Sequence, residues 1–175
     1  MMATAVQLTW LNACSRDEFV ASLADIFEHS PWLAAAVAGQ RPFASVAQLH
    51  AAMAEALRTA GETAQLALIR AHPELAGKAA LRGELTAASS SEQSGVGLDQ
   101  CSREEYEQLH ALNAAYQQKF TFPFILAVRG HDRASIIANF ARRIEASPAS
   151  EMAACIEQII AIAGFRLADK IAESS

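Results

Sequence analysis

The chain has 175 residues, 52% of them hydrophobic, with a formal net charge of −5. This length fits a single domain over residues 1–175, large enough to bury a core without disulfides or a metal. The acidic balance argues against nucleic acid as a partner, because phosphate backbones require a basic surface. No apolar run approaches the roughly 20 residues that span a bilayer, so we expect no membrane association.

The cysteine and histidine spacings indicate the compartment and argue against a metal. Cys14, Cys101 and Cys155 are widely separated and form no CxxC pair, which suits a reducing compartment. The N-terminus also lacks the basic and apolar regions of a signal peptide. We therefore expect a cytoplasmic protein. The histidines show no HxxxH or HxH spacing, so no metal site is predicted.

The alanine-rich composition favours helix over strand and predicts an all-α fold, a bundle of about seven to eight helices. A capping box at Ser15 opens a first helix that should end near His29. Ser30-Pro31 should cap a short second helix, and Ser45 a third. A fourth helix from about Glu62 should stop at His72-Pro73, because a residue before proline is pushed away from α geometry.

A linker is expected at residues 83–91, followed by Ser89-x-x-Glu92, which fits a capping box for a short helical piece. His72 and Glu92 would then lie at helix ends on either side of a flexible connection. Imidazole exchanges protons near neutral pH, and a carboxylate can orient it, so this pair is a candidate acid/base site. A structural interpretation also stands: a surface histidine near helix carbonyls and a stabilising carboxylate at N3.

The second half begins with a long helix predicted from Ser102 to Thr121. Residues 124–128 are five apolar residues with no partner strand, so we predict a buried extended segment whose backbone groups need partners, for which a ligand would serve. Asp132 should cap the next helix, and Ser147-Pro148 the last.

The last helix carries an apolar stripe broader than a peripheral helix needs, which favours a homodimer. Arg166 follows this stripe and should point inward, where it needs a carboxylate from the protein or from a ligand. The turn from Arg129 to Arg133 could hold an anion, although a charged surface turn explains it equally well. No GxSxG elbow or phosphate-binding loop is present. The residues alone thus define a helical domain with a candidate His/Glu/Arg site.

Several motifs together resemble a known family. They are His72-Pro73-Glu74-Leu75-Ala76-Gly77-Lys78, Leu85-Thr86 with Ser89-x-x-Glu92-Gln93, Gly97-Leu98-Asp99, Lys119-Phe120-Thr121-Phe122-Pro123-Phe124-Ile125, Glu28-His29-Ser30-Pro31-Trp32 and Arg41-Pro42-Phe43. In this order and spacing they closely resemble the 2-oxo-4-hydroxy-4-carboxy-5-ureidoimidazoline (OHCU) decarboxylases over nearly the whole chain. Departures are Glu74 for a frequent aspartate, Val96 for a usual alanine, and Thr121 where glycine is common.

The resemblance implies an all-helical, cofactor-free enzyme of urate breakdown that converts OHCU to (S)-allantoin and carbon dioxide. By motif, His72 would be the acid/base and Glu92 its partner. The implied substrate-binding residues are Pro73, Ser89, Gln93, the backbone of Phe124, Ile125, Leu126, Ala127 and Val128, and Arg166, which would face a carboxylate or carbonyl.

Two other functions stay open from the sequence. One is a related helical lyase or hydrolase that acts on another ureido or imidazolinone compound. The other is a non-enzymatic interaction module in which His72 and Glu92 only cap helices. The module predicts that alanine at either position costs only about 0.5–2 kcal/mol, with no catalytic effect.

Overall fold

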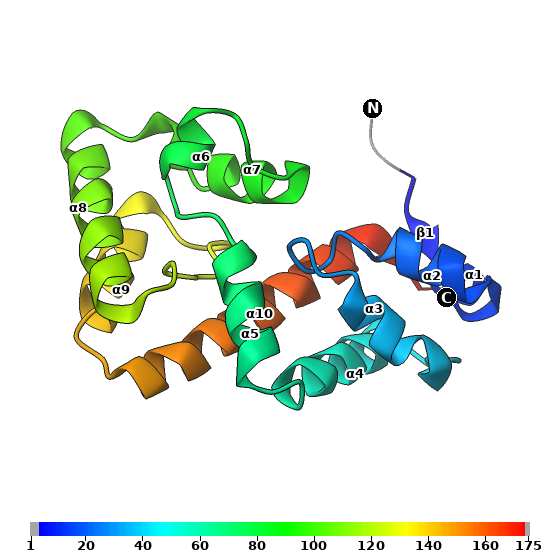
Figure 1. Cartoon of the computed structure of the whole chain (residues 1–175). Coiled ribbons are helices and arrows are strands. Elements are labelled where there is room, and N and C mark those ends of the chain that lie inside the picture. Colours follow the sequence, from blue (N-terminus) through cyan, green and yellow to red (C-terminus); the bar gives the residue numbers. More distant parts are fainter. Residues whose placement is uncertain (1–3, 174–175) are drawn as a thin grey trace. The chain divides into compact units, whose positions relative to one another are not determined.

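The structure is a computed structural model that describes residues 4–173 (Figure 1). These residues contain ten α-helices, two 3-10 turns and one two-stranded parallel sheet, in which Val6–Gln7 (β1) pairs with Ile171–Ala172 (β2). The all-α prediction is confirmed. The structure has more helices than predicted because the short helices α1 (Leu8–Ala13) and α6 (Lys78–Leu81) give little periodic signal.

The chain divides into two compact units, which are described separately. Unit 1 consists of Met1–Leu68 and Ile160–Ser175, and unit 2 of Ile69–Ile159. The boundaries fall within α5 (Glu62–Ala71) and within α10 (Pro148–Lys170). That the whole chain forms one domain stays a prediction.

Unit 1 contains α1 to α4, the N-terminal part of α5 and the C-terminal part of α10. Within it, α3 (Trp32–Val37) packs against both α2 (Arg16–Ser22) and α4 (Val46–Arg58), and a 3-10 turn, η1 (Ala38–Gln40), follows α3. The Ser15 capping box is confirmed: the Ser15 hydroxyl accepts from the Glu18 N–H at 3.1 Å.

The prediction that the first helix reaches His29 is wrong. α2 ends at Ser22, and irregular turns lead to His29, which has a φ of 49°. Leu23, Ile26 and Phe27 are all buried in these turns. Their helical spacing therefore reflects burial in successive turns, which the sequence does not distinguish from a helix. Ser30 does not cap α3 either, because its hydroxyl donates to the Glu28 carbonyl at 2.8 Å.

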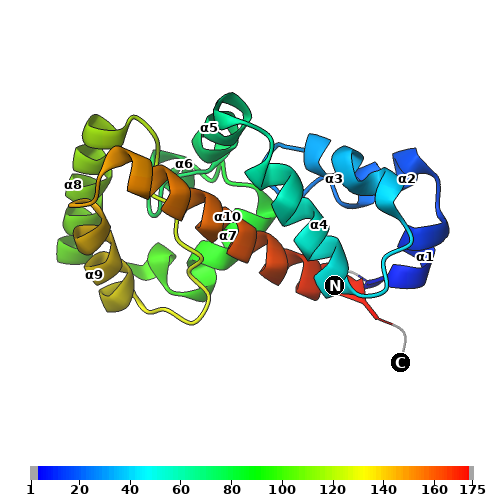
Figure 2. The same cartoon turned by 90° about the horizontal axis from the view of Figure 1, so that it is seen from below.

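Unit 2 contains the end of α5, α6 to α9 and the start of α10. α8 (Arg103–Phe120) and α9 (Arg133–Arg143) lie side by side (Figure 2). Its core is an aromatic cluster around the fully buried Tyr116 of α8. The rings whose centroids lie 4.5 to 6.0 Å from that of Tyr116 are Phe120, Phe122, Phe124 and Phe140.

The predicted linker and capping box before Glu92 are wrong. α7 (Ala87–Gly95) starts earlier, with Thr86 as N-cap accepting from the Ser89 N–H at 3.2 Å. A hydroxyl at Thr86 followed by two alanines offers the same start signal three residues upstream. Glu92 therefore lies well inside α7 and is not an N3 carboxylate. After α7, Gly97 adopts a φ of 79° and leads into a 3-10 turn, η2 (Leu98–Gln100).

Within residues 4–173, no helix is long and apolar enough to cross a membrane.

Candidate active site

His72 directly follows the last residue of α5, as the His72-Pro73 stop predicts. Its N–H donates to the Ile69 carbonyl at 3.1 Å, which closes the last turn. The side chain is buried, with the residue 8% exposed. The interpretation of His72 as a surface histidine is therefore wrong. Imidazole can exchange a proton near neutral pH, so the acid/base interpretation of His72 stays a prediction.

The loop after His72 is attached to two helices of unit 2. The Ala76 N–H donates to the Gln93 side chain on α7 at 3.0 Å. The Leu75 carbonyl accepts from the Asn113 side chain on α8 at 2.9 Å. The loop that begins with His72 and Pro73 is thus connected to the helix that carries Glu92.

Three predicted site residues share one side of α7. Ser89, Glu92 and Gln93 are spaced i, i+3 and i+4, which places them on one face of a helix. Ser89 and Gln93 are buried, and Glu92 is half-buried. Because Glu92 does not cap α7, the structural interpretation of this carboxylate does not apply.

Residues 124–128 form the predicted extended, buried segment, with Phe124 only 1% exposed. Some of its backbone groups are hydrogen-bonded to protein side chains. Arg143 donates to the Ile125 carbonyl, and the Ala127 N–H donates to the Gln158 side chain at 2.9 Å. The expectation that a ligand would satisfy this backbone therefore does not hold for these two groups.

A buried polar cluster next to this segment was not predicted. The Arg143 guanidinium pairs with the Glu151 carboxylate and lies 4.5 Å from the centroid of the Phe124 ring. The Tyr116 hydroxyl donates to Glu151 at 2.6 Å and lies 3.4 Å from the Cys155 sulfur. Glu151 and Cys155 are four residues apart in α10, but Tyr116 and Arg143 come from other helices, so spacing along the chain does not group the four.

Burial sets the protonation of this cluster. Burial raises the pKa of the Tyr116 hydroxyl far above its ordinary value, and the neighbouring Cys155 adds to the shift. Burial also raises the pKa of the Cys155 thiol, although its contacts with Tyr116 and Arg143 oppose the increase. Both groups are therefore neutral near pH 7, and they lie beside the ion pair of Arg143 and Glu151.

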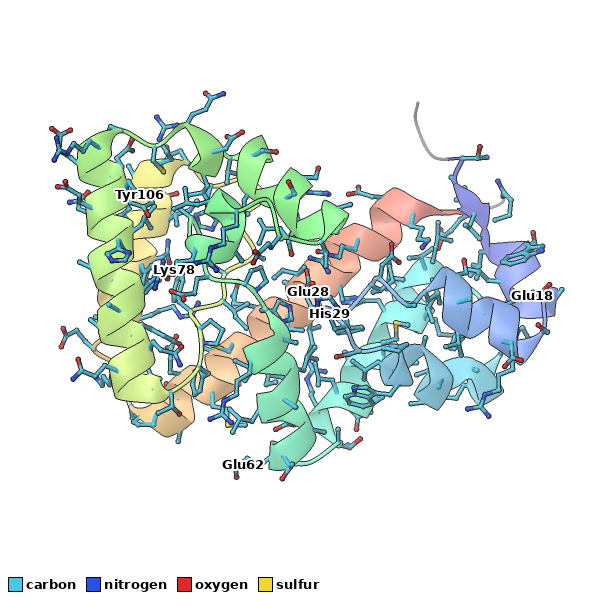
Figure 3. All side chains as sticks on the ribbon, turned by 45° about the horizontal axis from the view of Figure 1, so that its top comes forward. Glu18, Glu28, His29, Glu62, Lys78 and Tyr106 are labelled. Carbon is cyan, nitrogen blue, oxygen red and sulfur yellow. The ribbon has the colours of Figure 1, made fainter. Side chains whose placement is uncertain are left out.

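Arg166 points inward within unit 1, as predicted, and the sequence left open which carboxylate it meets. Its guanidinium donates to the Glu28 carboxylate at 2.9 Å and to the Asp25 and Ile26 carbonyls at 3.4 Å. Glu28 lies beside His29, whose imidazole is 3.9 Å from the carboxylate (Figure 3). A protein carboxylate thus already meets Arg166, and a substrate contact stays a prediction.

The remaining candidates have structural partners. Arg133 pairs with Glu105 at 3.0 Å and donates to the Gly97 carbonyl at 3.3 Å, which leaves it less suited to an exchangeable anion. The Arg133 guanidinium and the N-cap N–H of Ser102 both lower the pKa of Glu105, the Ser102 hydrogen bond more strongly. Within residues 4–173, no group of three or more His, Cys, Asp or Glu side chains could hold a metal ion.

Comparison with known proteins identifies the family. The OHCU decarboxylase family model matches residues 12–168. The 2-oxo-4-hydroxy-4-carboxy-5-ureidoimidazoline decarboxylase of Haloferax volcanii is 39% identical over 163 residues, which cover 93% of this chain and 95% of that protein. The protein of the same name from Mus musculus is 36% identical, with 94% of this chain and 93% of the relative covered.

Longer proteins and solved structures match as well. The uric acid degradation bifunctional protein of Bacillus subtilis is 37% identical across 93% of this chain, which spans 32% of that protein. The crystal structure of an (S)-allantoin synthase has a TM-score of 0.77 at 28% identity and covers 95% of this chain, which spans 54% of it. A crystal structure of an OHCU decarboxylase in the presence of (S)-allantoin, 19% identical with a TM-score of 0.61 over 93% of this chain and 96% of that one, shares the fold.

The fold and these relatives define the class of protein, a carboxy-lyase. The chain belongs to the OHCU decarboxylase family.

Proposed function

We propose that this protein decarboxylates OHCU to (S)-allantoin without a cofactor in urate breakdown, with His72 as acid/base and Glu92 as its partner. The observation that carries the proposal is the contact between the buried His72 loop and α7. Gln93, the residue after Glu92, accepts a hydrogen bond from that loop. The names of the similar proteins supply the substrate.

The proposed residues can meet the chemical requirements of this decarboxylation. Loss of carbon dioxide leaves an electron pair on the former C4, which delocalises into the adjacent ring. The protein has to hold the scissile carboxylate out of conjugation, stabilise the developing negative charge and deliver a proton to one face. His72 takes the hydroxyl or ring proton and controls the delivery of a proton to carbon. Glu92 orients His72 and accepts a hydrogen bond from a ring or ureido N–H of the substrate.

The other substrate contacts follow from the resemblance. Pro73 and Ser89 line the substrate, the backbone of residues 124–128 meets its ring and ureido groups, and Arg166 anchors a carboxylate or carbonyl. Gln93 is the remaining member of this set, and it also contacts the loop that follows His72.

Location and assembly belong to the same proposal. The three cysteines are free, which suits the cytoplasm. The homodimer is proposed from the breadth of the apolar stripe that the sequence gives the last helix, although Ile156, Ile159, Ile160, Ala163 and Leu167 of that stripe are buried within the chain. Light scattering after size-exclusion chromatography tests this directly, since the chain has a mass of 18.7 kDa. A species of twice that mass supports the dimer, and a species of that mass contradicts it.

The activity is tested by forming OHCU in place from urate with urate oxidase and hydroxyisourate hydrolase. Circular dichroism then follows allantoin after this protein is added. Uncatalysed decay gives racemic product and no lasting signal, so a growing signal reports stereoselective turnover. His72→Ala is expected to abolish it, whereas His110→Ala, at an exposed position of α8, should not. No signal from folded wild-type protein would contradict the assignment and favour another ureido substrate or the interaction module.

A further inference from the structure

The loop that follows His72 adopts a backbone conformation that its residues do not favour by themselves. Ala76 has a φ of 51°, in the left-handed region that L residues with a Cβ avoid. A Cβ added at Gly77 would lie 2.7 Å from the Cβ of Glu74, so the turn is also too tight for a side chain there. Such a loop keeps its shape only when its surroundings fix it.

Gln93 fixes this loop at two points. Its side-chain oxygen accepts from the N–H of Ala76, the residue with positive φ, and its amide nitrogen donates to the Glu74 carbonyl at 3.3 Å. Gln93 is 6% exposed. Its amide therefore uses one acceptor and one donor on the protein backbone, where the resemblance assigns it to substrate.

Asn113 holds the same loop from α8, between the two Gln93 contacts. Its amide nitrogen donates to the Leu75 carbonyl, and its side-chain oxygen is buried with no hydrogen-bond partner among residues 4–173. A buried acceptor without a partner costs about 1–3 kcal/mol. An apolar side chain at this position would avoid the cost. The asparagine therefore fits a role in which its contact with the loop matters.

We infer that Gln93 and Asn113 are positioning residues, which hold the loop at residues 74–76 and so fix His72 relative to Glu92 on α7. The resemblance also assigns Gln93 to substrate, and the contacts with the loop add a second role to that one. Because Glu92 and Gln93 are adjacent in α7, a shift of the loop changes the distance between the proposed acid/base and its partner. The catalytic consequence of this inference rests on the proposed function. The hydrogen bonds that hold the loop are independent of that function.

Steady-state kinetics separates positioning from substrate binding. A positioning role predicts that Gln93→Ala lowers kcat by about 100-fold, the cost of a small misplacement, whatever its effect on KM. A raised KM at unchanged kcat, with weaker inhibition by (S)-allantoin, would show that Gln93 serves only to bind substrate and would overturn the positioning role.

Asn113→Ala should also lower kcat at little changed KM, and the two changes should be non-additive because they release one loop. Gln117→Ala, at an exposed position of α8, is the matched control and should leave kcat unchanged. Additive losses, or a lower melting temperature with unchanged kcat, would overturn the inference.

Amide hydrogen exchange tests, without any turnover, whether Gln93 and Asn113 hold the loop at residues 74–76. We call this set of hydrogen bonds the clamp. Gln93→Ala should speed exchange of the Ala76 N–H well beyond any change at the N–H groups of α8. Unchanged exchange at Ala76 would contradict the clamp. If wild-type protein shows no turnover but Gln93→Ala exposes the Ala76 N–H, the proposed function fails and the clamp stands.

Discussion

At the scale of single residues, burial distinguishes His72 from the other histidines. His72 is buried at a helix end, whereas His29 and His110 are exposed. His50 is held by the Ile160 carbonyl at 2.7 Å and would clash with a side chain at Gly164, which indicates a packing role. The histidine that the motif resemblance implies is thus also the buried one.

His72→Gln and Glu92→Ala are each expected to lower kcat by about 10²–10⁴-fold, the usual contribution of a positioned acid or base. Any change in the free energy of unfolding of either variant should be too small to explain the fall in kcat. The coupled dichroism assay gives the rate, and thermal unfolding gives the stability. Near-normal turnover with retained (S) selectivity in either variant would rule out the assignment, and His110→Gln serves as the matched control.

The pair between Arg166 and Glu28 makes a second prediction at this scale. Both residues are almost completely buried, so Glu28→Met leaves a buried guanidinium without its carboxylate. We expect the free energy of unfolding to fall by about 3–5 kcal/mol.

Glu107→Met is the control for that measurement. Its partner Arg103 is exposed, with a side chain 90% accessible, and loss of such a pair should cost less than about 1 kcal/mol. Equal effects of the two changes in a denaturant titration would show that Arg166 does not depend on Glu28.

At the scale of elements, the sequence predicts those helix starts that depend on a local cap, although the predicted Ser30 cap was wrong. The N-caps at Ser15, Ser102 and Asp132 are confirmed because each cap is a local hydrogen bond between residues three apart. The end of α2 and the start of α7 were wrong. In the first case burial follows tertiary packing, and in the second Thr86 and Ser89 offer competing caps.

The candidate site divides in the same way. Motif order supplied His72, Glu92 and their neighbours, because these residues lie in continuous stretches. The contacts of Gln93 and Asn113 with the loop, and of Arg143 with Ile125, join residues 17 or more positions apart. Pairings of this kind depend on how helices pack, which spacing along the chain does not encode.

Thr121, the departure from the common glycine, ends α8 with a φ of 65°. A β-branched residue is strained in this region, and glycine is preferred at such helix ends. Thr121→Gly should therefore raise the free energy of unfolding by about 0.5–1 kcal/mol, because the relief of strain exceeds the added chain entropy. The gain should be visible as a higher melting temperature.

Thr59→Gly is the matched control. Thr59 follows α4 with a φ of −96°, so glycine there relieves no strain and loses the hydroxyl contact with the Glu55 carbonyl. It should destabilise the protein. If Thr121→Gly destabilises to the same extent, the left-handed conformation at Thr121 carries no strain.

At the scale of the whole molecule, a buried ion pair is found in each unit. Arg166 and Glu28 lie in unit 1, and Arg143 and Glu151 in unit 2. The pair in unit 2 adjoins two buried neutral acids, the Tyr116 hydroxyl and the Cys155 thiol. Because burial raises both pKa values, this cluster makes the free energy of unfolding depend on pH in the alkaline range.

The sign of that dependence follows from linkage. Cys155 has a raised pKa in the folded protein and an ordinary value of 9.0 when unfolded. The unfolded chain therefore loses this proton first as pH rises, and stability falls above about pH 9 by up to about 1.4 kcal/mol per pH unit for each such group. Tyr116 adds a second decline above its ordinary value of 10.0.

Below those values both groups are protonated in either state, so neither makes stability depend on pH. Urea titrations at several pH values between 8 and 11 measure the slope. Cys155→Ala should flatten the first part, and Tyr116→Phe the part above pH 10, whatever each change does to stability at pH 8. A slope that is the same in wild type and in both variants would mean that the thiol and the phenol can ionise inside the folded unit, in contradiction to their burial between α8 and α10.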